Sequence, residues 1–328
     1  MPTESKAVPA FRFALLMGGF VSCALLIAAA YQWISHNRDL RENPPPGQLV
    51  DVGGYRMHIH CTGQGSPTVI LDSGLSDSSL SWFRVQPNIA QFTRVCSYDR
   101  AGLGWSDESP YPRESKVFAE ELHTLLHNAG IPAPFILVGH SMGGFDVLIY
   151  AHLYPDQVKG MVLVDSAYPD LANRLPELKT SLSEWRKSLE REEYVMPFGI
   201  PRVLGRCGTG TAELVPQLQT VECDMSWIKE TVAECQSMWN ESAAQAGSVR
   251  SLEDLPLVVI SEDPAKNVNK FMPEFERGQD ALAHLSTSGS RVVAIGSGHQ
   301  IQKERPDLVI ESVHKLWTGT HNAPEKGT

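Results

Sequence analysis

The sequence is poor in basic residues and contains no cluster of them. Lys and Arg together number 28 against 38 Asp and Glu, which gives a formal net charge of −10. Binding to the phosphates of a nucleic acid needs clustered Lys and Arg, so nucleic acid is excluded as an expected partner. Internal repeats and low-complexity tracts are also absent. The content of 42% hydrophobic and 20% charged residues is typical of a globular protein.

Signals for metals and disulfides are weak. His123 and His127 have the i, i+4 spacing of a helical zinc motif, but no Glu accompanies them in the required position. Of the six cysteines, Cys23 falls in an apolar run and the other five are an odd number, so a complete disulfide framework is not implied. If the domain faces an oxidising compartment, the sequence allows one disulfide among Cys207, Cys223 and Cys235.

Only one long apolar run is present, at residues 13–34. Its 22 residues carry no charge, and as a helix with a rise of about 1.5 Å per residue they would span the roughly 30 Å hydrocarbon layer of a membrane. A cleaved signal peptide is the alternative, but its apolar region is normally only about 7–15 residues long. We therefore expect a short flank at residues 1–12 and a single-pass signal anchor at 13–34. The orientation stays open because the two flanks carry similar numbers of Lys and Arg.

Residues 35–48 predict a linker between this anchor and a globular domain. The segment is charged at first and then contains Pro44, Pro45 and Pro46, which favour an extended spacer. From Leu49 onward, apolar runs bounded by Gly and Pro predict strands, and these alternate with predicted helices at 115–128, 273–286 and 306–317. This alternation predicts an α/β fold, with a mostly parallel central sheet and helices on both faces.

The alternation stops between residues 168 and 252, where helix-like stretches occur without a convincing strand. This predicts an inserted helical cap at 168–252 that divides the core into 49–167 and 253–318, with a tail at 319–328. The cap contains three tryptophans, namely Trp185, Trp227 and Trp239.

The segment FILVGHSMGG carries the main chemical signal. Gly139 to Gly143 match G-x-S-x-G, directly after a predicted buried strand and directly before a predicted helix, which is the setting that this motif requires. Ser141 is therefore the expected nucleophile. A serine hydroxyl needs a base within hydrogen-bonding reach, and His299, in GSGHQ after the last predicted strand, is the expected partner.

The region from Leu49 to Trp317 resembles the α/β-hydrolase family. The resemblance rests on four motifs in the family's order: DSGLSDSSLSW, YDRAGLGWSD, VGHSMGG and GSGHQ. It implies hydrolysis of an ester, thioester, amide, lactone or epoxide without a metal or cofactor. Relatives with an Asp nucleophile are disfavoured because Ser141 occupies the position of the nucleophile.

The resemblance also implies an oxyanion hole made by the backbone N–H groups of Leu75 and Met142. The family more often has His-Gly where this chain has Ser73-Gly74, but a backbone donor need not be impaired by this departure. In YDRAGLGWSD, Asp99, Arg100 and Ser106 are expected to shape the turn and to form ion pairs near the site.

The sequence leaves open which carboxylate orients His299, because candidates occur at the ends of two predicted strands. Asp263 follows the strand where the family usually places its acid, Asp165 ends an earlier strand that some relatives use, and Glu262 is a third choice. Asp263 is slightly preferred.

The expected function is a membrane-anchored serine hydrolase that acts on a small-molecule ester or a lipid-like substrate. The cap tryptophans and the anchor favour an apolar or amphiphilic substrate. The alternative is a non-catalytic or weakly catalytic ligand-binding protein on the same fold, which the presence of both Ser141 and His299 disfavours.

Overall fold

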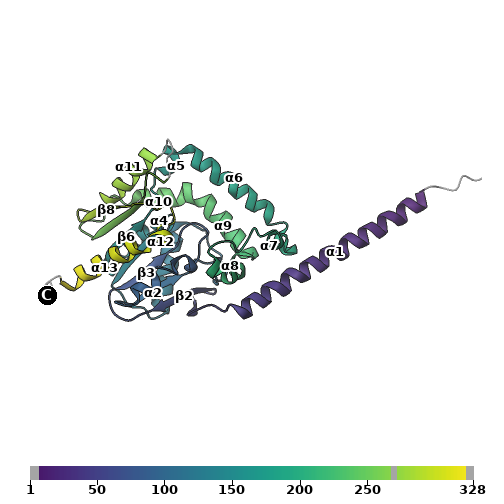
Figure 1. The fold of residues 1–328 in the computed structure, drawn as a ribbon, viewed down its shortest axis with the longest axis horizontal. Helices are drawn as coiled ribbons and strands as arrows, with labels where there is room; N and C mark the ends of the chain where they lie inside the picture. Colours follow the sequence, from purple (N-terminus) through teal and green to yellow (C-terminus); the bar gives the residue numbers. More distant parts are fainter. Residues whose placement is uncertain (1–6, 267–271, 323–328) are drawn as a thin grey trace, which may run out of the picture. The chain divides into compact units, whose positions relative to one another are not determined.

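A computed structural model describes residues 7–266 and 272–322 of the chain (Figure 1). It divides into two compact units, one made of residues up to 44 together with 189–228, and the other of residues 45–188 together with 229–328. Each unit is described separately below. The first six and last six residues, which belong to the expected flank and tail, lie outside the described part.

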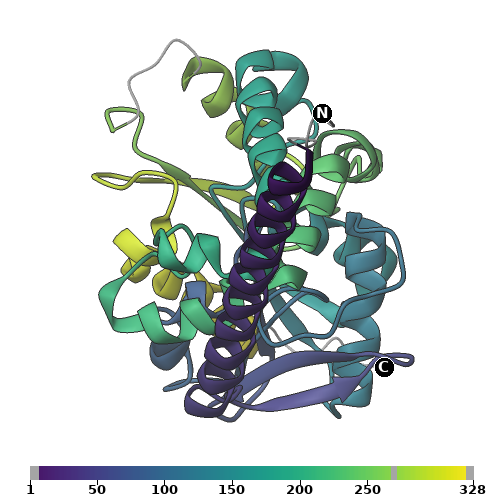
Figure 2. The same cartoon turned by 90° about the vertical axis from the view of Figure 1, so that its right-hand side faces the viewer.

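The larger unit contains an eight-stranded sheet in the order β1-β2-β4-β3-β5-β6-β7-β8. The strands are β1 (Gln48–Asp51), β2 (Arg56–Thr62), β3 (Thr68–Asp72), β4 (Val95–Tyr98), β5 (Phe135–His140), β6 (Val158–Val164), β7 (Leu257–Glu262) and β8 (Gly289–Ala294). The pairs from β4 to β8 are parallel, whereas β1 and β2 form an antiparallel hairpin at one edge (Figure 2). The mostly parallel sheet expected from the sequence is therefore confirmed.

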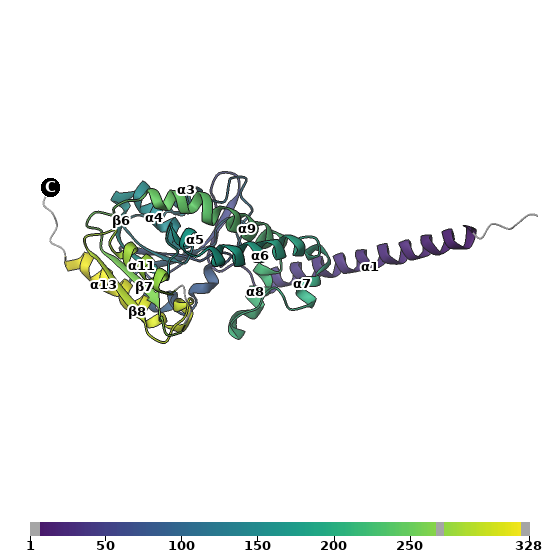
Figure 3. The ribbon, with the colours of Figure 1, turned by 90° about the horizontal axis from the view of Figure 1, so that it is seen from above.

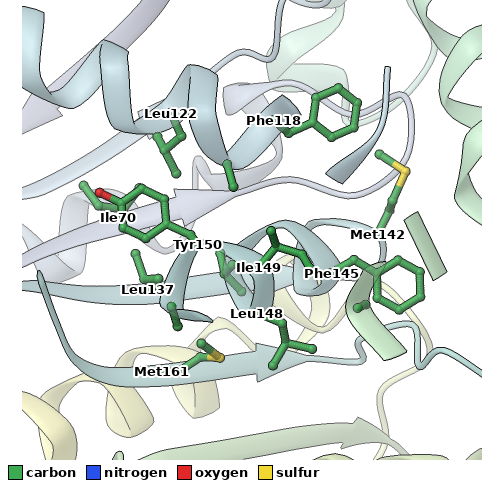
Figure 4. Packing of buried hydrophobic residues seen from close by; sticks show 14 of the residues in the cluster. Ile70, Phe118, Leu122, Leu137, Met142, Phe145, Leu148, Ile149, Tyr150 and Met161 are labelled. Atoms are coloured by element: carbon green, nitrogen blue, oxygen red, sulfur yellow. The ribbon is translucent and has the colours of Figure 1, made fainter. Parts of the chain in front are cut away.

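Both faces of this sheet are covered because successive residues of its central strands are apolar and point to opposite faces. On β3, Ile70 packs into a core with residues of α3 and α4, whereas Val69 and Leu71 pack into a second core with residues of α13. The two layers of helices lie on opposite sides of the sheet (Figure 3), and Figure 4 shows Ile70 and Leu137 in the first core with Phe118, Leu122 and Tyr150. A strand that is buried on both faces reads as a continuous apolar run, as in TVILD.

The helices around the sheet follow the alternation predicted from the sequence. Outside the 168–252 stretch, the α-helices packed around the sheet are α2 (Gln86–Ile89), α3 (Ser115–Asn128), α4 (Gly143–Leu153), α11 (Met272–Ala283), α12 (Ile301–Glu304) and α13 (Pro306–Asn322), with 3-10 turns η1 (Ser79–Trp82) and η2 (Pro155–Gln157). Because α13 continues to Asn322, it includes the first residues of the expected 319–328 tail.

The stretch from 168 to 252 is described completely and contains no strand, in agreement with its helical pattern. Its elements are α5 (Leu171–Arg174), α6 (Pro176–Glu192), η3 (Met196–Phe198), α7 (Ile200–Val203), η4 (Ala212–Leu214), α8 (Val215–Glu222), α9 (Met225–Ser237), η5 (Met238–Ser242) and α10 (Ala243–Ser248). They do not form one body, because residues 189–228 group with the N-terminal helix and the remainder groups with the sheet.

The smaller unit is built on α1 (Ala7–Glu42), which extends eight residues beyond the expected anchor. The expected linker at 35–48 is therefore helical as far as Glu42, because no Pro or Gly interrupts the charged segment before Pro44. Gln32, Ser35 and Asp39 lie on one face of α1 and are buried. The amide of Gln32 donates to the Cys223 carbonyl at 2.8 Å, so this end of α1 is part of a folded unit.

Two disulfides are present. Cys207 and Cys223 are joined within the smaller unit, as the sequence allowed. Cys61 and Cys96, which are directly paired residues of β2 and β4, are joined in the larger unit and were not expected to be. Cys23 and Cys235 are the two free cysteines.

Candidate active site

Ser141 occupies the turn between β5 and α4. Its φ of 52° is in the left-handed region, which is strained for a residue with a side chain. A Cβ at Gly139 would lie 2.5 Å from the Gly143 carbonyl oxygen, and one at Gly143 would lie 2.6 Å from the Ser73 carbonyl oxygen. The two motif glycines therefore permit a strand and a helix to approach closely enough to form this turn.

His299 lies between Ser141 and a carboxylate. Its Nε2 is 3.1 Å from Ser141 Oγ, and its Nδ1 is 2.6 Å from Asp165 Oδ2. Asp165 directly follows β6 and is fully buried, and its other oxygen accepts the Glu262 backbone N–H at 2.8 Å. Hydroxyl, imidazole and carboxylate thus form one continuous hydrogen-bonded series.

Asp263, the slightly preferred acid in the sequence, does not contact His299 in the described residues. Its carboxylate accepts the backbone N–H of Gly296 at 2.8 Å and that of Ala265 at 2.9 Å. A short carboxylate next to a loop is readily held by backbone amides in this way. Glu262 lines the same pocket, but the two ring nitrogens of His299 face Asp165 and Ser141. Of the three candidate acids, the structure places Asp165 within hydrogen-bonding distance of the imidazole.

The pKa of His299 is raised above its usual value. Burial opposes the charged imidazolium, but the hydrogen bond and charge of Asp165 outweigh it, and Glu262 and Asp77 add to the effect. Although it is surrounded by protein, the side chain is 47% exposed, because it opens into a pocket. The imidazole can therefore reach a bound molecule.

A second histidine holds the loop that carries His299. His140, the residue before Ser141, is buried and donates from Nε2 to the His299 carbonyl at 3.0 Å. The Gln302 amide donates to His140 Nδ1 at 3.3 Å, which fixes the same neutral tautomer. Burial, together with the nearby charge of His299, keeps the pKa of His140 well below its usual value. His140 and Gln302 were not singled out in the sequence.

The loop after β3 lies against Ser141. A Cβ at Gly74 would be 3.2 Å from Ser141 Cβ, so the backbone approaches the serine closely here. Leu75, the next residue, lines the pocket beside Ser141, and Met142 follows Ser141 directly. In residues 7–266 and 272–322, neither the Leu75 N–H nor the Met142 N–H donates a hydrogen bond to another protein group. Neither backbone donor is therefore taken up by another group among the described residues.

Buried ion pairs hold this loop in place. Arg100 donates to the carbonyls of Ser73 and Gly74, each at 2.7 Å, and its Nε donates to Glu234 at 2.6 Å. The second oxygen of Glu234 accepts the N–H of Ser76 at 2.9 Å. The expected ion pairing of Arg100 is therefore present. Its partner Glu234, on α9, was missed because nothing in MSWIKETVAECQS distinguishes it from other helix glutamates.

Similarity to known proteins agrees with this arrangement. The family model for the alpha/beta hydrolase fold matches residues 67–208. A thermophilic esterase from Thermogutta terrifontis superposes with a TM-score of 0.63 at 21% identity, covering 84% of this chain and 99% of that one. The chain is an α/β-hydrolase-fold protein.

Two relatives of similar sequence are described as uncharacterized. An uncharacterized protein of Schizosaccharomyces pombe is 28% identical over 83% of this chain. The match covers 53% of that protein, so this chain spans about half of its length. An uncharacterized vacuolar membrane protein of Saccharomyces cerevisiae is 30% identical over 36% of this chain and 21% of its own length. These similarities leave the substrate of this α/β-hydrolase-fold protein open.

The pocket of this α/β-hydrolase-fold protein is largely apolar. It has a volume of about 420 Å³, and Ser141, His299 and Asp165 line it. Apolar lining comes from α5, α6, η5 and α11, chiefly Leu171, Leu175, Leu178, Leu182, Trp239 and Phe275. Of the three tryptophans noted in the sequence, Trp239 is the one in this lining. In the described part of the chain, no group of three His, Cys, Asp or Glu side chains is arranged to hold a metal ion.

Proposed function

We propose that this protein is a serine hydrolase that cleaves a carboxylic ester or a related acyl bond. The observation that carries the proposal is the series from Ser141 Oγ to His299 Nε2, at 3.1 Å, and from His299 Nδ1 to Asp165, at 2.6 Å. A hydroxyl, an imidazole and a buried carboxylate in this order can activate the serine.

In the proposed reaction, Ser141 Oγ attacks the carbonyl carbon while His299 Nε2 takes the hydroxyl proton. Asp165 accepts the Nδ1–H of His299 and stabilises the imidazolium that forms. His299 then gives the proton to the leaving alcohol, which leaves an acyl group on Ser141. A water molecule, deprotonated by His299, releases the acid and restores the serine.

The negative charge that develops on the carbonyl oxygen needs donors that are already in position. We assign this role to the free backbone N–H groups of Leu75 and Met142. Arg100 and Glu234 would act as positioning residues for the Leu75 N–H. Arg100 binds the carbonyl of Gly74, which precedes Leu75, and Glu234 binds the N–H of Ser76, which follows it.

The substrate is proposed to carry an apolar acyl group. The aliphatic and aromatic lining beside Ser141 supports this, since apolar surface is removed from water when such a group binds. Asp77 and Glu262 also line the pocket and disfavour an anionic acyl group by charge repulsion.

We further propose that α1 anchors the enzyme in a membrane by a single span. Within the described residues, α1 is the one helix long and apolar enough to cross a membrane, and its most apolar stretch is not buried in the protein. The vacuolar membrane relative adds modest support.

Burst kinetics on the full-length protein in detergent test the hydrolase proposal. Mixing with a p-nitrophenyl ester should release p-nitrophenol in a rapid phase that is equimolar with enzyme, followed by slower turnover, because the acyl-enzyme accumulates. Ser141→Ala should lose both phases. Ester binding without any p-nitrophenol release from the wild-type protein would instead indicate a non-catalytic binding protein.

A further inference from the structure

The smaller unit exposes apolar side chains beside the proposed membrane helix. Residues 194–205, YVMPFGIPRVLG, contain one charged side chain, Arg202. Four large side chains of this segment are exposed: Tyr194 (79%), Ile200 (40%), Val203 (70%) and Leu204 (56%). We call these four residues the α7 patch.

The only charge in the segment points away from the patch. Arg202 is largely buried and pairs with Asp39 of α1, and its Nε donates to Gln32 Oε1 at 3.2 Å. The segment also packs closely on α1, since a Cβ at Gly199 would lie 3.1 Å from the Tyr31 ring. These contacts fix the α7 patch beside the residues around Tyr31 and Gln32.

This is also the level at which α1 would leave the membrane. The uncharged run begins at Phe13, and Gln32 is the first residue after it whose side chain is buried in the unit, so the run from Phe13 to Tyr31 has 19 residues, both ends included. At about 1.5 Å per residue they span about 28 Å, close to the thickness of the hydrocarbon layer. Tyr31 and Trp33, both exposed, are residue types that favour the membrane–water interface.

We propose that the α7 patch is a second membrane-contacting surface, which lies in the lipid interface next to the point where α1 emerges. The occupant is the bilayer, because the patch is continuous with a helix that is itself proposed to be embedded in lipid. At the level of the lipid interface, the bilayer itself would remove these exposed apolar side chains from water, and no protein partner would be needed to cover them. The inference rests on the proposed membrane anchor.

Fluorophores at three positions of the full-length protein test this inference. Cys23, in the middle of α1, is labelled in a Cys235→Ser protein, and Val203→Cys and Glu42→Cys are made after replacing both Cys23 and Cys235 by Ser. Glu42 is exposed at the end of α1, 11 residues beyond Tyr31, or about 16 Å at the rise of a helix. Each labelled protein is reconstituted in phosphatidylcholine vesicles that contain nitroxide-bearing lipid.

The expected result is lipid quenching and a blue-shifted emission at Cys23 and at position 203, with neither at position 42. If Cys23 is quenched by lipid while position 203 behaves like position 42, the patch proposal is overturned and the anchor stands. If position 203 is protected from both nitroxide lipid and aqueous iodide, another protein surface covers the patch, which also overturns the proposal. If Cys23 itself escapes lipid quenching, the anchor fails and the patch proposal fails with it.

Discussion

His299 Nδ1 lies 2.6 Å from Asp165 Oδ2, although Asp165 and His299 are 134 residues apart in the sequence. Asp263 is held instead by the amides of Gly296 and Ala265. We therefore predict that Asp165→Asn lowers kcat by about three to four orders of magnitude, because the amide no longer fixes the imidazole tautomer or stabilises its charge.

The matched control for this prediction is Asp263→Asn, which should retain kcat within a few-fold. Both variants are assayed on the same p-nitrophenyl ester, with thermal unfolding to confirm that they fold. Equal losses in the two variants, or full activity in Asp165→Asn, would contradict the assignment of Asp165.

The raised pKa of His299 predicts the acidic limb of the pH profile. His299 must be neutral to accept the Ser141 proton, so kcat/KM should fall as the pH drops through a pKa above the usual value of about 6.5. In Asp165→Asn the residual activity should titrate at lower pH, because the charge that raises the pKa is gone. His284→Gln changes an exposed histidine and should leave both the acidic limb of the pH profile and the maximal kcat/KM unchanged. A limb at the same pH in all three proteins would argue against His299 as the base.

The contacts of Glu234 predict an effect on the rate rather than on substrate binding. Glu234→Gln should lower kcat about 10- to 100-fold with little change in KM, because it weakens the contacts that hold Ser76 and Arg100 beside Leu75. The expected loss is smaller than the roughly 100- to 1,000-fold loss in kcat that follows removal of a whole oxyanion-hole donor, since the Leu75 N–H is still present. Binding of a boronic acid inhibitor, which resembles the tetrahedral intermediate, should weaken in parallel with kcat.

A variant one helical turn away separates this effect from loss of stability. Glu230, also on α9, is buried and accepts a hydrogen bond from Arg113 Nε at 2.6 Å, and among the described residues it has no hydrogen bond to the loop after β3. Glu230→Gln also breaks a buried ion pair, and should therefore lower the melting temperature while retaining kcat. If both variants lose kcat in proportion to their stability, Glu234 has no special positioning role.

The pocket lining predicts acyl-chain selectivity. Leu178→Trp adds bulk to a cavity of about 420 Å³, and should reduce kcat/KM for p-nitrophenyl octanoate by at least about ten-fold while p-nitrophenyl acetate is hydrolysed at the wild-type rate. Leu153→Trp, on a partly exposed leucine at the end of α4 outside this lining, is the control. A change that is equal for both esters would place the acyl group elsewhere.

Much of the fold could be predicted from the sequence because its local signals agree with one another. The apolar runs TVILD and FILVGH are buried strands, and the amphipathic segment Ser115–Asn128 is a helix with the predicted bounds. Ser141 and His299 were predicted to be partners, and the structure brings them together. A strand, a glycine turn and a helix are local features, so a single segment of the chain specifies them.

Features that depend on long-range contacts could not be predicted in the same way. The strands β6 and β7 are parallel neighbours, so Asp165 and Asp263 both lie at the same edge of the sheet. Which of the two carboxylates is free to approach His299 depends on the loop after β8, because the Gly296 N–H in that loop binds Asp263. The helical extension of α1 to Glu42 is stabilised by the pairing of Asp39 with Arg202, far along the chain. Glu234 likewise acquires its place only when α9 packs against the loop after β3.

The nucleophilicity of Ser141 is the central claim, and labelling with a fluorophosphonate followed by peptide mass spectrometry tests it most directly. On the full-length protein we predict one phosphonate adduct, on Ser141, with labelling abolished in Ser141→Ala and reduced to background in His299→Ala. Absence of an adduct on Ser141, or labelling that His299→Ala leaves unchanged, would contradict the account.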